Sequence, residues 1–445
     1  MTHKKTELFH NRSSSKEFLF YKTDTKPKKD TAEALSSAAA DRILNAFPDI
    51  LAQKNFMDYA MAQLESSTQF EAMVIKIDTL KHNAETAGNY GIDLWIDVAH
   101  VIDAICRREN GIWGRLDPGR FGCFFSEKNE TPPVELAKKI NDGLAEIRNE
   151  TVSIGIASYP TLSFEKDQIL DHAGKALDHA AFFGPGSTVS FDAVSLNISG
   201  DTRYQNGDID GAIEEFKTAL LLDPSDVNLH NSLGVCYGIL SDHDNALKEF
   251  QEAVRLDPNQ VMALYNSGLI NMLTEDTEKA LQYFLEAGEK EDDIFEITFQ
   301  TGNVYLKMGT PEKAKKFLEK AVTLNSESSP AFRCLGECYS AMNMNGDAIS
   351  AYKKALRLNP NDAESLSTLG YLFDLLGENP EITTSLCQQS IDIAPGNGLF
   401  RHRFGNLYLK RNQLEDALKQ FQKAHDLGHD SGDMIEKIKR LMLDN

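Results

Sequence analysis

Two pairs of side chains in this sequence have the types and the spacing that could begin a metal site. Cys334 and Cys338 lie four residues apart, and so do His425 and His429. Residues at i and i+4 face the same side of a helix, so each pair offers two ligands within one turn. A structural zinc site takes four ligands, and the sequence shows no third or fourth. We therefore expect no metal and no cofactor, and interpret the pairs as buried small side chains and a solvated helix end.

The sequence also lacks the short motifs that mark common enzymes. It contains no G-x-S-x-G, H-E-x-x-H or P-loop pattern. Gly184-Pro185-Gly186 has the composition of a loop and not of a phosphate cradle, and the charged run from Glu289 to Asp293 suits a solvated turn. The candidate working surface must then be sought on the larger elements.

An internal repeat defines most of those elements. Between residues 227 and 260, two amphipathic helical patterns flank the polar turn 241–244, and Asp257-Pro258 ends the second. Small residues allow two helices to cross closely, and we expect the large aromatic residues to fill the space between successive pairs. One pair cannot bury its apolar face alone, so stability comes from stacking. Small residues recur every 34 positions, at Gly234, Gly268, Gly302, Gly336 and Gly370 and at Ala212, Ala246, Ala280, Ala314 and Ala348.

This 34-residue period, with its Leu-Gly-x-x-Tyr, Ala, Phe, Ala, Pro pattern, resembles the tetratricopeptide repeat. The third and fourth units lack the closing Pro, having Asp292 and Ser326 there, and the sixth carries one extra residue. The stretch 432–445 would supply the capping helix that such an array needs. The resemblance implies seven repeats over 193–431: 193–226, 227–260, 261–294, 295–328, 329–362, 363–397 and 398–431.

The resemblance further implies that the first helix of each pair lines a groove for extended peptides or partner helices. Asn and Gln there can pair with a peptide main chain, Arg333 and Arg403 can bind a carboxylate, and Tyr265 and Phe299 can act as apolar anchors. The alternative for each residue is a polar, solvated face. The candidate groove residues are Asn231, Tyr265, Asn266, Phe299, Gln300, Asn303, Arg333, His402, Arg403 and Asn406.

The composition excludes several classes of protein. Of 445 residues 41% are hydrophobic, enough for a folded core, and the net charge is −21, from 46 Lys and Arg against 67 Asp and Glu. This acidity disfavours nucleic-acid binding. We expect no membrane span and no secretory signal, because the sequence shows no long apolar run and its N-terminal residues are polar. Six scattered cysteines without a C-x-x-C predict a reducing cytoplasm.

Residues 1–40 are polar and mildly basic, with seven lysines and the tract Ser13-Ser14-Ser15. We interpret them as a flexible tail, with docking to an anionic surface as the alternative.

Residues 41–192 change to a mixture of strands and helices. Asp117-Pro118-Gly119 is a hairpin signal, because Pro sets φ and Gly permits a positive φ. Strands paired through a hairpin with helices between them predict an α+β sheet of the ferredoxin-like kind. The expected strands are 72–77, 111–116, 120–125, 152–158 and 188–191, and the expected helices are 92–107, 133–148 and 164–181.

The order of these pieces resembles the GGDEF domain of diguanylate cyclases. VSIGIASYP at 152–160 is similar to that family's late strand, and residues 172–186 are similar to its final helix. Residues 77–93 match its D-x-F-K-x-x-N-D segment in outline, and RLDPGRFGCFF at 115–125 stands at the GGDEF signature. The resemblance implies an N-terminal GGDEF-like domain joined to an all-α tetratricopeptide solenoid.

The groups that the family's chemistry needs are missing. Lys76 stands where the first Mg²⁺ carboxylate belongs, and Gly119 and Arg120 replace the signature acids. The signature glycines are Asp117 and Pro118, the phosphate contacts fall on Ala181 and Pro185, and a guanine contact falls on Ala84. Asp78, Lys81, Asp93 and Arg108 persist, and of these Asp93 and Arg108 are the possible nucleotide-binding residues. The resemblance therefore implies a domain without catalytic activity.

Two hypotheses follow. The first is a cytoplasmic bacterial scaffold or adaptor in signalling, which binds protein partners in the groove and uses the GGDEF-like domain for regulation or docking. The second is a sensor in which that domain binds GTP or cyclic di-GMP. The short stretch 189–200 offers little linker, so we expect the first repeat to abut the sheet. The partner, the pathway and the oligomeric state stay open.

Overall fold

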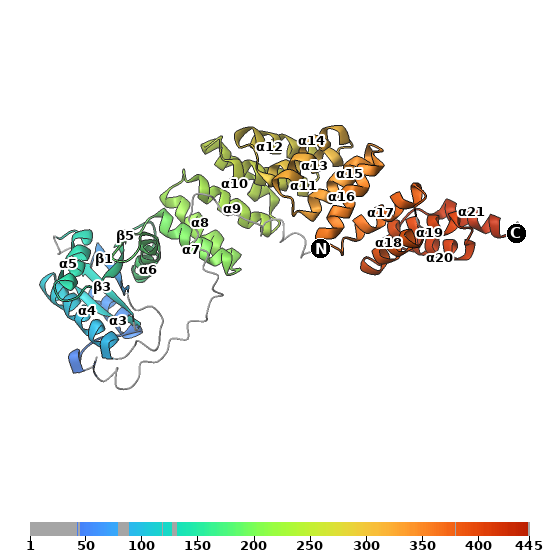
Figure 1. Cartoon of the computed structure of the whole chain (residues 1–445). Helices are drawn as coiled ribbons and strands as arrows, with labels where there is room; N and C mark the ends of the chain where they lie inside the picture. The colour runs from blue at the N-terminus through green and yellow to red at the C-terminus, as the bar shows by residue number, and fades with distance from the viewer. Residues whose placement is uncertain are drawn as a thin grey trace. The chain divides into compact units, whose positions relative to one another are not determined.

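The structure is a computed structural model that describes residues 42, 45–78, 89–117, 119–126, 131–378 and 380–443 (Figure 1). The chain forms two compact units, Met1–Leu256 and Asp257–Asn445, and each is described by itself. The predicted tail at 1–40 lies outside the described residues, as do Lys81, Ala84 and Pro118. The boundary expected at residue 192 stays a prediction.

The first unit contains the expected sheet. Its five strands lie in the order β2-β3-β1-β4-β5. Neighbours β2/β3, β3/β1 and β1/β4 are antiparallel, and β5 runs parallel to β4. The hairpin turn is held by Gly119, whose N–H donates to the Asp117 carboxylate at 2.9 Å. The strands are β1 Phe70–Ile77, β2 Ile112–Asp117, β3 Arg120–Ser126, β4 Val152–Tyr159 and β5 Thr188–Ser190.

The sequence of strand β1 is almost continuously apolar because both of its faces are buried. Alternate side chains point to opposite faces of a sheet. Met73 and Ile75 pack in one cluster with residues of helices α4 (Asn89–Arg108) and α5 (Pro133–Ala145). Ala72 and Val74 pack in the other with residues of α3 (Gln53–Gln63) and α6 (Ile169–Ala180). The sheet is therefore the middle layer of three (Figure 1).

Helix α6 lies very close to β4, and one glycine makes this possible. A Cβ on Gly155 would stand 2.0 Å from the carbonyl oxygen of Ala173 and 2.2 Å from the nitrogen of Leu177. Any larger residue would force the helix away from the sheet. The helix begins at Ile169, five residues later than predicted, because Glu165 caps a separate 3-10 turn, Lys166–Gln168.

Four further helices complete the first unit: α7 Ala193–Gln205, α8 Ile209–Leu222, α9 Val227–Ile239 and α10 His243–Leu256. Helix α6 contacts α7 directly, as the short connection predicted. Lys175 of α6 reaches across to Glu215 of α8 at 2.9 Å, and Arg203 of α7 lies 3.3 Å from the same carboxylate. Only 8% of the Glu215 side chain is exposed, so this ion pair fastens the sheet to the first helical pair from within.

The second unit continues the helical pairs. In each of three pairs a glycine of the first helix meets an aromatic ring of the second: Gly268 and Phe284, Gly336 and Tyr352, and Gly405 and Phe421. These rings therefore fill space within a pair, which the sequence pattern did not predict. They also cluster with Val304, Leu369 and Ile438 of the helix that follows each pair, as predicted. The helices are α11 Val261–Leu273, α12 Thr277–Lys290, α13 Phe295–Lys307, α14 Pro311–Leu324, α15 Ser329–Ala341, α16 Asn345–Leu358, α17 Ala363–Leu375, α18 Pro380–Ile393, α19 Gly398–Lys410, α20 Leu414–Asp426 and α21 Gly432–Leu443.

Candidate functional site

In the second unit the first helices of successive pairs, α11, α13, α15, α17 and α19, lie side by side. The Tyr265 hydroxyl of α11 lies near the Gln300 side chain of α13, and α13 contacts α15. Arg333 of α15 reaches Glu364 of α17 at 3.1 Å, and Arg403 of α19 reaches Ser367 of α17 at 3.1 Å. We call the surface formed by these five helices the first-helix face.

At the α11 and α13 end, the predicted aromatic anchor is part of the packing. The Tyr265 ring lies 5.7 Å from the Phe284 ring, and burial raises the pKa of its phenol. Asn266 is 6% exposed and already takes part in an interaction within the chain. Gln300 and Asn303 are half-buried, and the Asn303 amide donates to the Gln300 oxygen at 3.3 Å. This end offers a short polar line of amides.

Phe299, the other predicted anchor, is half-buried. Its ring stacks on Phe295 of the same helix, with centroids 5.7 Å apart and planes 7° apart. It also packs against the cluster that contains Cys334 and Leu335. Part of the ring remains accessible, so Phe299 keeps the apolar character that the sequence suggested.

Arg333 is surrounded by acids of its own chain. Its guanidinium lies 2.9 Å from Glu337, 3.1 Å from Glu364 and 3.5 Å from Asp362. Burial raises the pKa of Glu337, although Arg333 opposes that shift. One positive charge thus faces three carboxyl groups. A carboxylate from a partner would meet net negative charge here, so this geometry argues against the carboxylate capture expected of Arg333.

Arg403 has neutral partners instead. One of its terminal nitrogens donates to Ser367 Oγ at 3.1 Å and to Thr368 Oγ1 at 3.0 Å. Its guanidinium carbon lies 5.7 Å from the centre of the Tyr371 ring, which is 45% exposed. Among the described residues no acid forms an ion pair with Arg403, and burial lowers its pKa. An uncompensated, partly buried guanidinium is a ready site for an anion.

The remaining groove residues have structural roles or lie apart. His402 shares a hydrogen bond with Ser431 Oγ at 2.8 Å, and its ring contacts Phe421 and His429. Burial lowers the pKa of His402, so its neutral ring ties α19 to the start of α21. Asn406 follows one turn later on α19 and is half-buried. Asn231 belongs to α9 of the first unit.

The two possible nucleotide-binding residues are not brought together either. Asp93 lies near the start of α4 and is paired with Arg42. Arg108 ends the same helix with 77% of its side chain exposed, 3.9 Å from Glu109. Fifteen residues of α-helix separate them, which corresponds to about 22 Å.

At the positions of the expected metal site, the sheet carries cations. Lys76 of β1 stands opposite Arg120 of β3 in the strand register. Asp78 is used by the fold, since its carboxylate accepts from Thr151 Oγ1 at 2.7 Å, Ser153 Oγ at 2.6 Å and the Gly186 N–H at 2.7 Å. Two adjacent cations disfavour Mg²⁺ binding at this edge.

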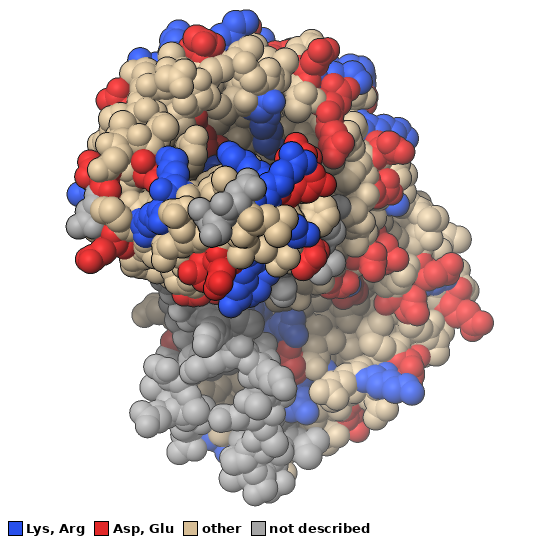
Figure 2. Space-filling view, turned by 90° about the vertical axis from the view of Figure 1, so that its right-hand side faces the viewer, with Lys and Arg blue, Asp and Glu red and all other residues tan. Residues whose placement is uncertain are grey.

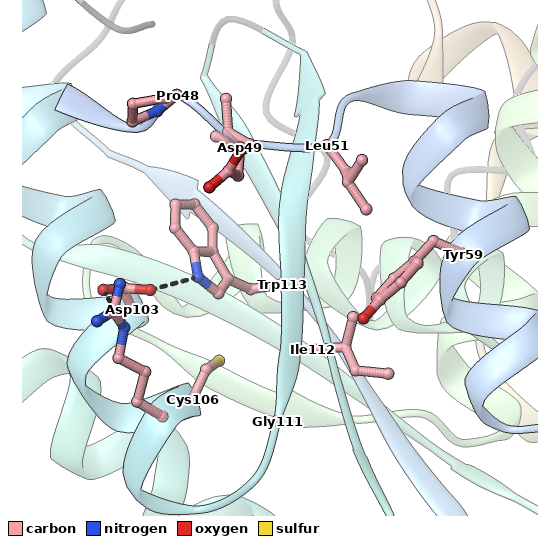
Figure 3. A pocket seen from close by; sticks show the side chains of 11 residues that line it. Pro48, Asp49, Leu51, Tyr59, Asp103, Cys106, Gly111, Ile112 and Trp113 are labelled. Atoms are coloured by element: carbon pink, nitrogen blue, oxygen red, sulfur yellow. Dashed lines mark hydrogen bonds and ion pairs between the residues drawn. The ribbon is translucent and has the colours of Figure 1, made fainter. Parts of the chain in front are cut away.

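A pocket of about 670 Å³ opens beside β2, between residues of α3 and α4 (Figure 3). Trp113 lines it, and its indole N–H donates to Asp103 at 3.1 Å. Arg107 pairs with the same carboxylate at 2.8 Å. Tyr59 lines the other side of the strand from Trp113 (Figure 3). Sequence reasoning missed this pocket, because it arises where residues 48–51 pass the edge strand and no local motif marks it.

Neither the cysteine pair nor the histidine pair gains a third possible metal ligand in the described part of the chain. There, no group of three or more His, Cys, Asp and Glu side chains is placed to hold a metal ion. Cys334 and Cys338 are free and buried, and burial raises their pKa values to about 12 and about 11. Of the described helices, none is long and apolar enough to cross a membrane.

Charge on the surface is mixed. Figure 2 shows acidic and basic side chains interspersed over the face in view, although the whole chain carries a net charge of −21. Local pairing, as around Arg333, therefore decides what an incoming charge meets.

Three comparisons place the repeats among known proteins. Family models described as TPR repeat and tetratricopeptide repeat match residues 200–238, 240–294, 297–328 and 335–362. No catalytic family is indicated by these models. No curated protein matches the chain. The models reach no further toward the N-terminus than residue 200, so the resemblance of residues 41–192 to the GGDEF domain stays a prediction.

Solved structures similar to the chain include YrrB, described as a TPR protein with an unusual peptide-binding site, at 22% identity and a TM-score of 0.39, covering 42% of this chain and 96% of that one. MamA is 27% identical with a TM-score of 0.35, covering 37% and 96%. A tetratricopeptide repeat protein from Parabacteroides merdae is 17% identical with a TM-score of 0.42, covering 56% and 98%. At these TM-scores the likenesses add nothing to the family models. On the family models, then, the chain contains tetratricopeptide repeats between residues 200 and 362.

Proposed function

We propose that this protein is a non-catalytic scaffold whose first-helix face binds an extended segment of a partner protein. The tetratricopeptide repeats support a protein-interaction role. The observation that carries the proposal is the environment of Arg403, which lacks the acidic partners that surround Arg333. The partner segment places a carboxylate, from a side chain or a chain end, on this guanidinium.

The donors of Arg403 suit this role. Ser367 and Thr368 both accept from one terminal nitrogen, Nη1, and a guanidinium has five N–H donors in all. The other nitrogens can form a two-pronged contact with a carboxylate. Burial disfavours the charged form of Arg403. A bound anion would stabilise that charged form. The exposed part of Tyr371 would cover an apolar side chain next to that carboxylate.

The experiment is a selection of random twelve-residue peptides displayed on phage against the full chain, followed by titration of labelled peptides by fluorescence polarisation. We expect Asp, Glu or a free C-terminus to be enriched at one position. The variant Arg403→Gln should weaken those peptides. Arg357→Gln is the matched control, because Arg357 is an exposed arginine on a second helix, α16. Equal binding by wild type and Arg403→Gln would refute the assignment of this residue.

We infer further that residues 41–192 form an inactive GGDEF-like module used for docking or regulation. The order strand, helix, two strands, helix, strand from β1 to β4 supports a ferredoxin-like fold. Lys76 opposite Arg120 supports inactivity. Incubation with GTP and Mg²⁺ should give no cyclic di-GMP, and formation of that product would exclude the inference.

The nucleotide-sensor alternative has no comparable support. Asp93 is engaged by Arg42, and Arg108 is mostly exposed and lies beside an acid. Calorimetric titration with GTP and with cyclic di-GMP decides between the two, since micromolar binding of either would favour the sensor. The cytoplasmic location and the bacterial origin stay predictions.

A further inference from the structure

Helix α7, the first helix of the first pair, carries two polar groups that have no partner among the described residues. Asn197 is 5% exposed, and within that part of the chain its side-chain oxygen accepts no hydrogen bond. A buried acceptor without a donor costs free energy, so such a group calls for an explanation. Asn197 lies 34 residues before Asn231, at the same position of the repeat as that predicted groove residue.

Asp201 follows Asn197 by four residues and therefore shares its side of α7. Its carboxyl group has neither an ion pair nor a hydrogen bond within the described part of the chain, and burial raises its pKa to about 6. Its charge acts on Tyr204 of α7 and on Cys236 of α9. The carboxyl group thus lies on the side of α7 that is near α9.

The basic residues around it are already used. Arg203 pairs with Asp208 at 2.8 Å and with Glu215 at 3.3 Å, and Lys175 pairs with Glu215 at 2.9 Å. The neighbouring groups that Asp201 influences, a phenol and a thiol, carry no positive charge. Among the described residues, the site therefore lacks a cation and an N–H donor.

We propose that Asn197 and Asp201 form a subsite for a lysine or arginine side chain of an extended partner segment. Asp201 pairs with the positive charge, and the Asn197 oxygen accepts an N–H from the segment's main chain. The subsite rests on the proposed function, since it extends peptide binding by first helices to the first unit and names the chemistry that a peptide bound there must have. Two unpartnered acceptors and no cation select a basic residue and reject an acidic one.

The test uses the same displayed peptides and the full chain. Lys or Arg should be enriched at one peptide position when wild type is the target, and that enrichment should vanish with Asp201→Asn. In titrations, a selected peptide should bind Asp201→Asn at least tenfold more weakly than wild type. Asp210→Asn is the matched control, because Asp210 is an exposed acid on the second helix α8, and it should bind within twofold of wild type. Asn197→Leu should weaken binding several-fold while circular dichroism stays unchanged.

The outcomes separate this inference from the proposed function. If some selected peptides need Arg403 but none of the selected peptides shows a fixed basic residue, the subsite alone is overturned. The same holds if peptides with that basic residue bind Asp201→Asn as well as wild type. Failure to select any peptide would count against both. Residues 1–29 contain eight Lys and Arg and three Asp and Glu, so the chain itself is a competing source of lysine. If carbodiimide couples Asp201 to a lysine of residues 1–29 in the full chain, the subsite holds the chain's own lysine and the proposal of a partner is overturned.

Discussion

Arg333 and Arg403 both lie on first helices of the second unit, yet their surroundings are opposite. Arg333 is enclosed by Glu337, Asp362 and Glu364. Arg403 faces two hydroxyl groups and an aromatic ring. Arg333 is a structural cation with three carboxyl partners. Arg403 forms no ion pair with any described acid. The same residue type on two first helices thus has two different roles, and the side chains of the neighbouring helical pair determine which role it has.

The largest effect should appear on the stability side of this comparison. Arg333→Gln leaves three carboxyl groups facing one another, so we expect the free energy of unfolding to fall by about 2 kcal/mol. Denaturant titration measures this. Adding Glu337→Gln should recover part of the loss. Arg403→Gln should change stability much less, and a larger loss for Arg403→Gln than for Arg333→Gln would reverse the comparison.

Binding should show the opposite order. Removing the charged donor at Arg403 should weaken carboxylate-bearing peptides about 10- to 100-fold, which is ~1.4–2.8 kcal/mol. Arg333→Gln, measured without denaturant so that it is folded, should bind the same peptides with an affinity within a few-fold of wild type. Similar losses for both variants would mean that the two arginines belong to one site.

Asp201 extends the comparison to the first unit. It is an acid, not a base, and it forms no ion pair with any described residue. Its pKa is raised from 3.8 to about 6, so folding favours the protonated form. The stability linked to this group is present below about pH 4 and is lost as pH rises through 6. Asp201→Asn should therefore be more stable than wild type by about 1 kcal/mol at pH 7.5 and equal to it near pH 4. A variant that is less stable at pH 7.5 would show that Asp201 has an internal partner.

The smallest expected effect is the pH dependence of lysine-peptide binding. Between pH 7.5 and 5, the Asp201 carboxylate takes up a proton and stops pairing with the ammonium group. Tyr204 and Cys236, which face it, have raised pKa values and stay neutral in this range. Affinity should fall several-fold in wild type and stay level in Asp201→Asn, as fluorescence polarisation at a series of pH values would show.

Much of the fold could be predicted from the sequence. The 34-residue register placed the helices because Gly234 and its equivalents must accept a large side chain from the second helix of the same pair. The unbroken apolar run in β1 predicted a buried strand, and both faces of β1 are covered. These features depend on residues close in sequence or on a strict period, so the pattern alone carries them.

The site was less accessible to sequence reasoning. Glu337 could be foreseen as a neighbour of Arg333, since it lies one turn away, but Asp362 and Glu364 come from the next pair. Tyr265 was expected to face a partner, whereas its ring packs on Phe284. Asn197 and Asp201 were missed because the glycine register was followed only from Gly234, in the second repeat. The equivalence of Asn197 with Asn231 was the signal that could have revealed it.

The fastening of α6 to the first helical pair has a practical consequence. Phe191 packs into the cluster beneath the sheet and also into the cluster of α7, α8 and α9. Cutting the chain just before α7 would therefore bare apolar surface, strand the Glu215 carboxylate without Lys175 and leave the array without its N-terminal cover. We expect the repeats expressed from residue 193 to be poorly soluble. A version that begins at residue 160, and so keeps α6, should be recovered at higher yield but still lack the rest of the sheet. The sheet and α6 thus act as the N-terminal cap of the first helical pair.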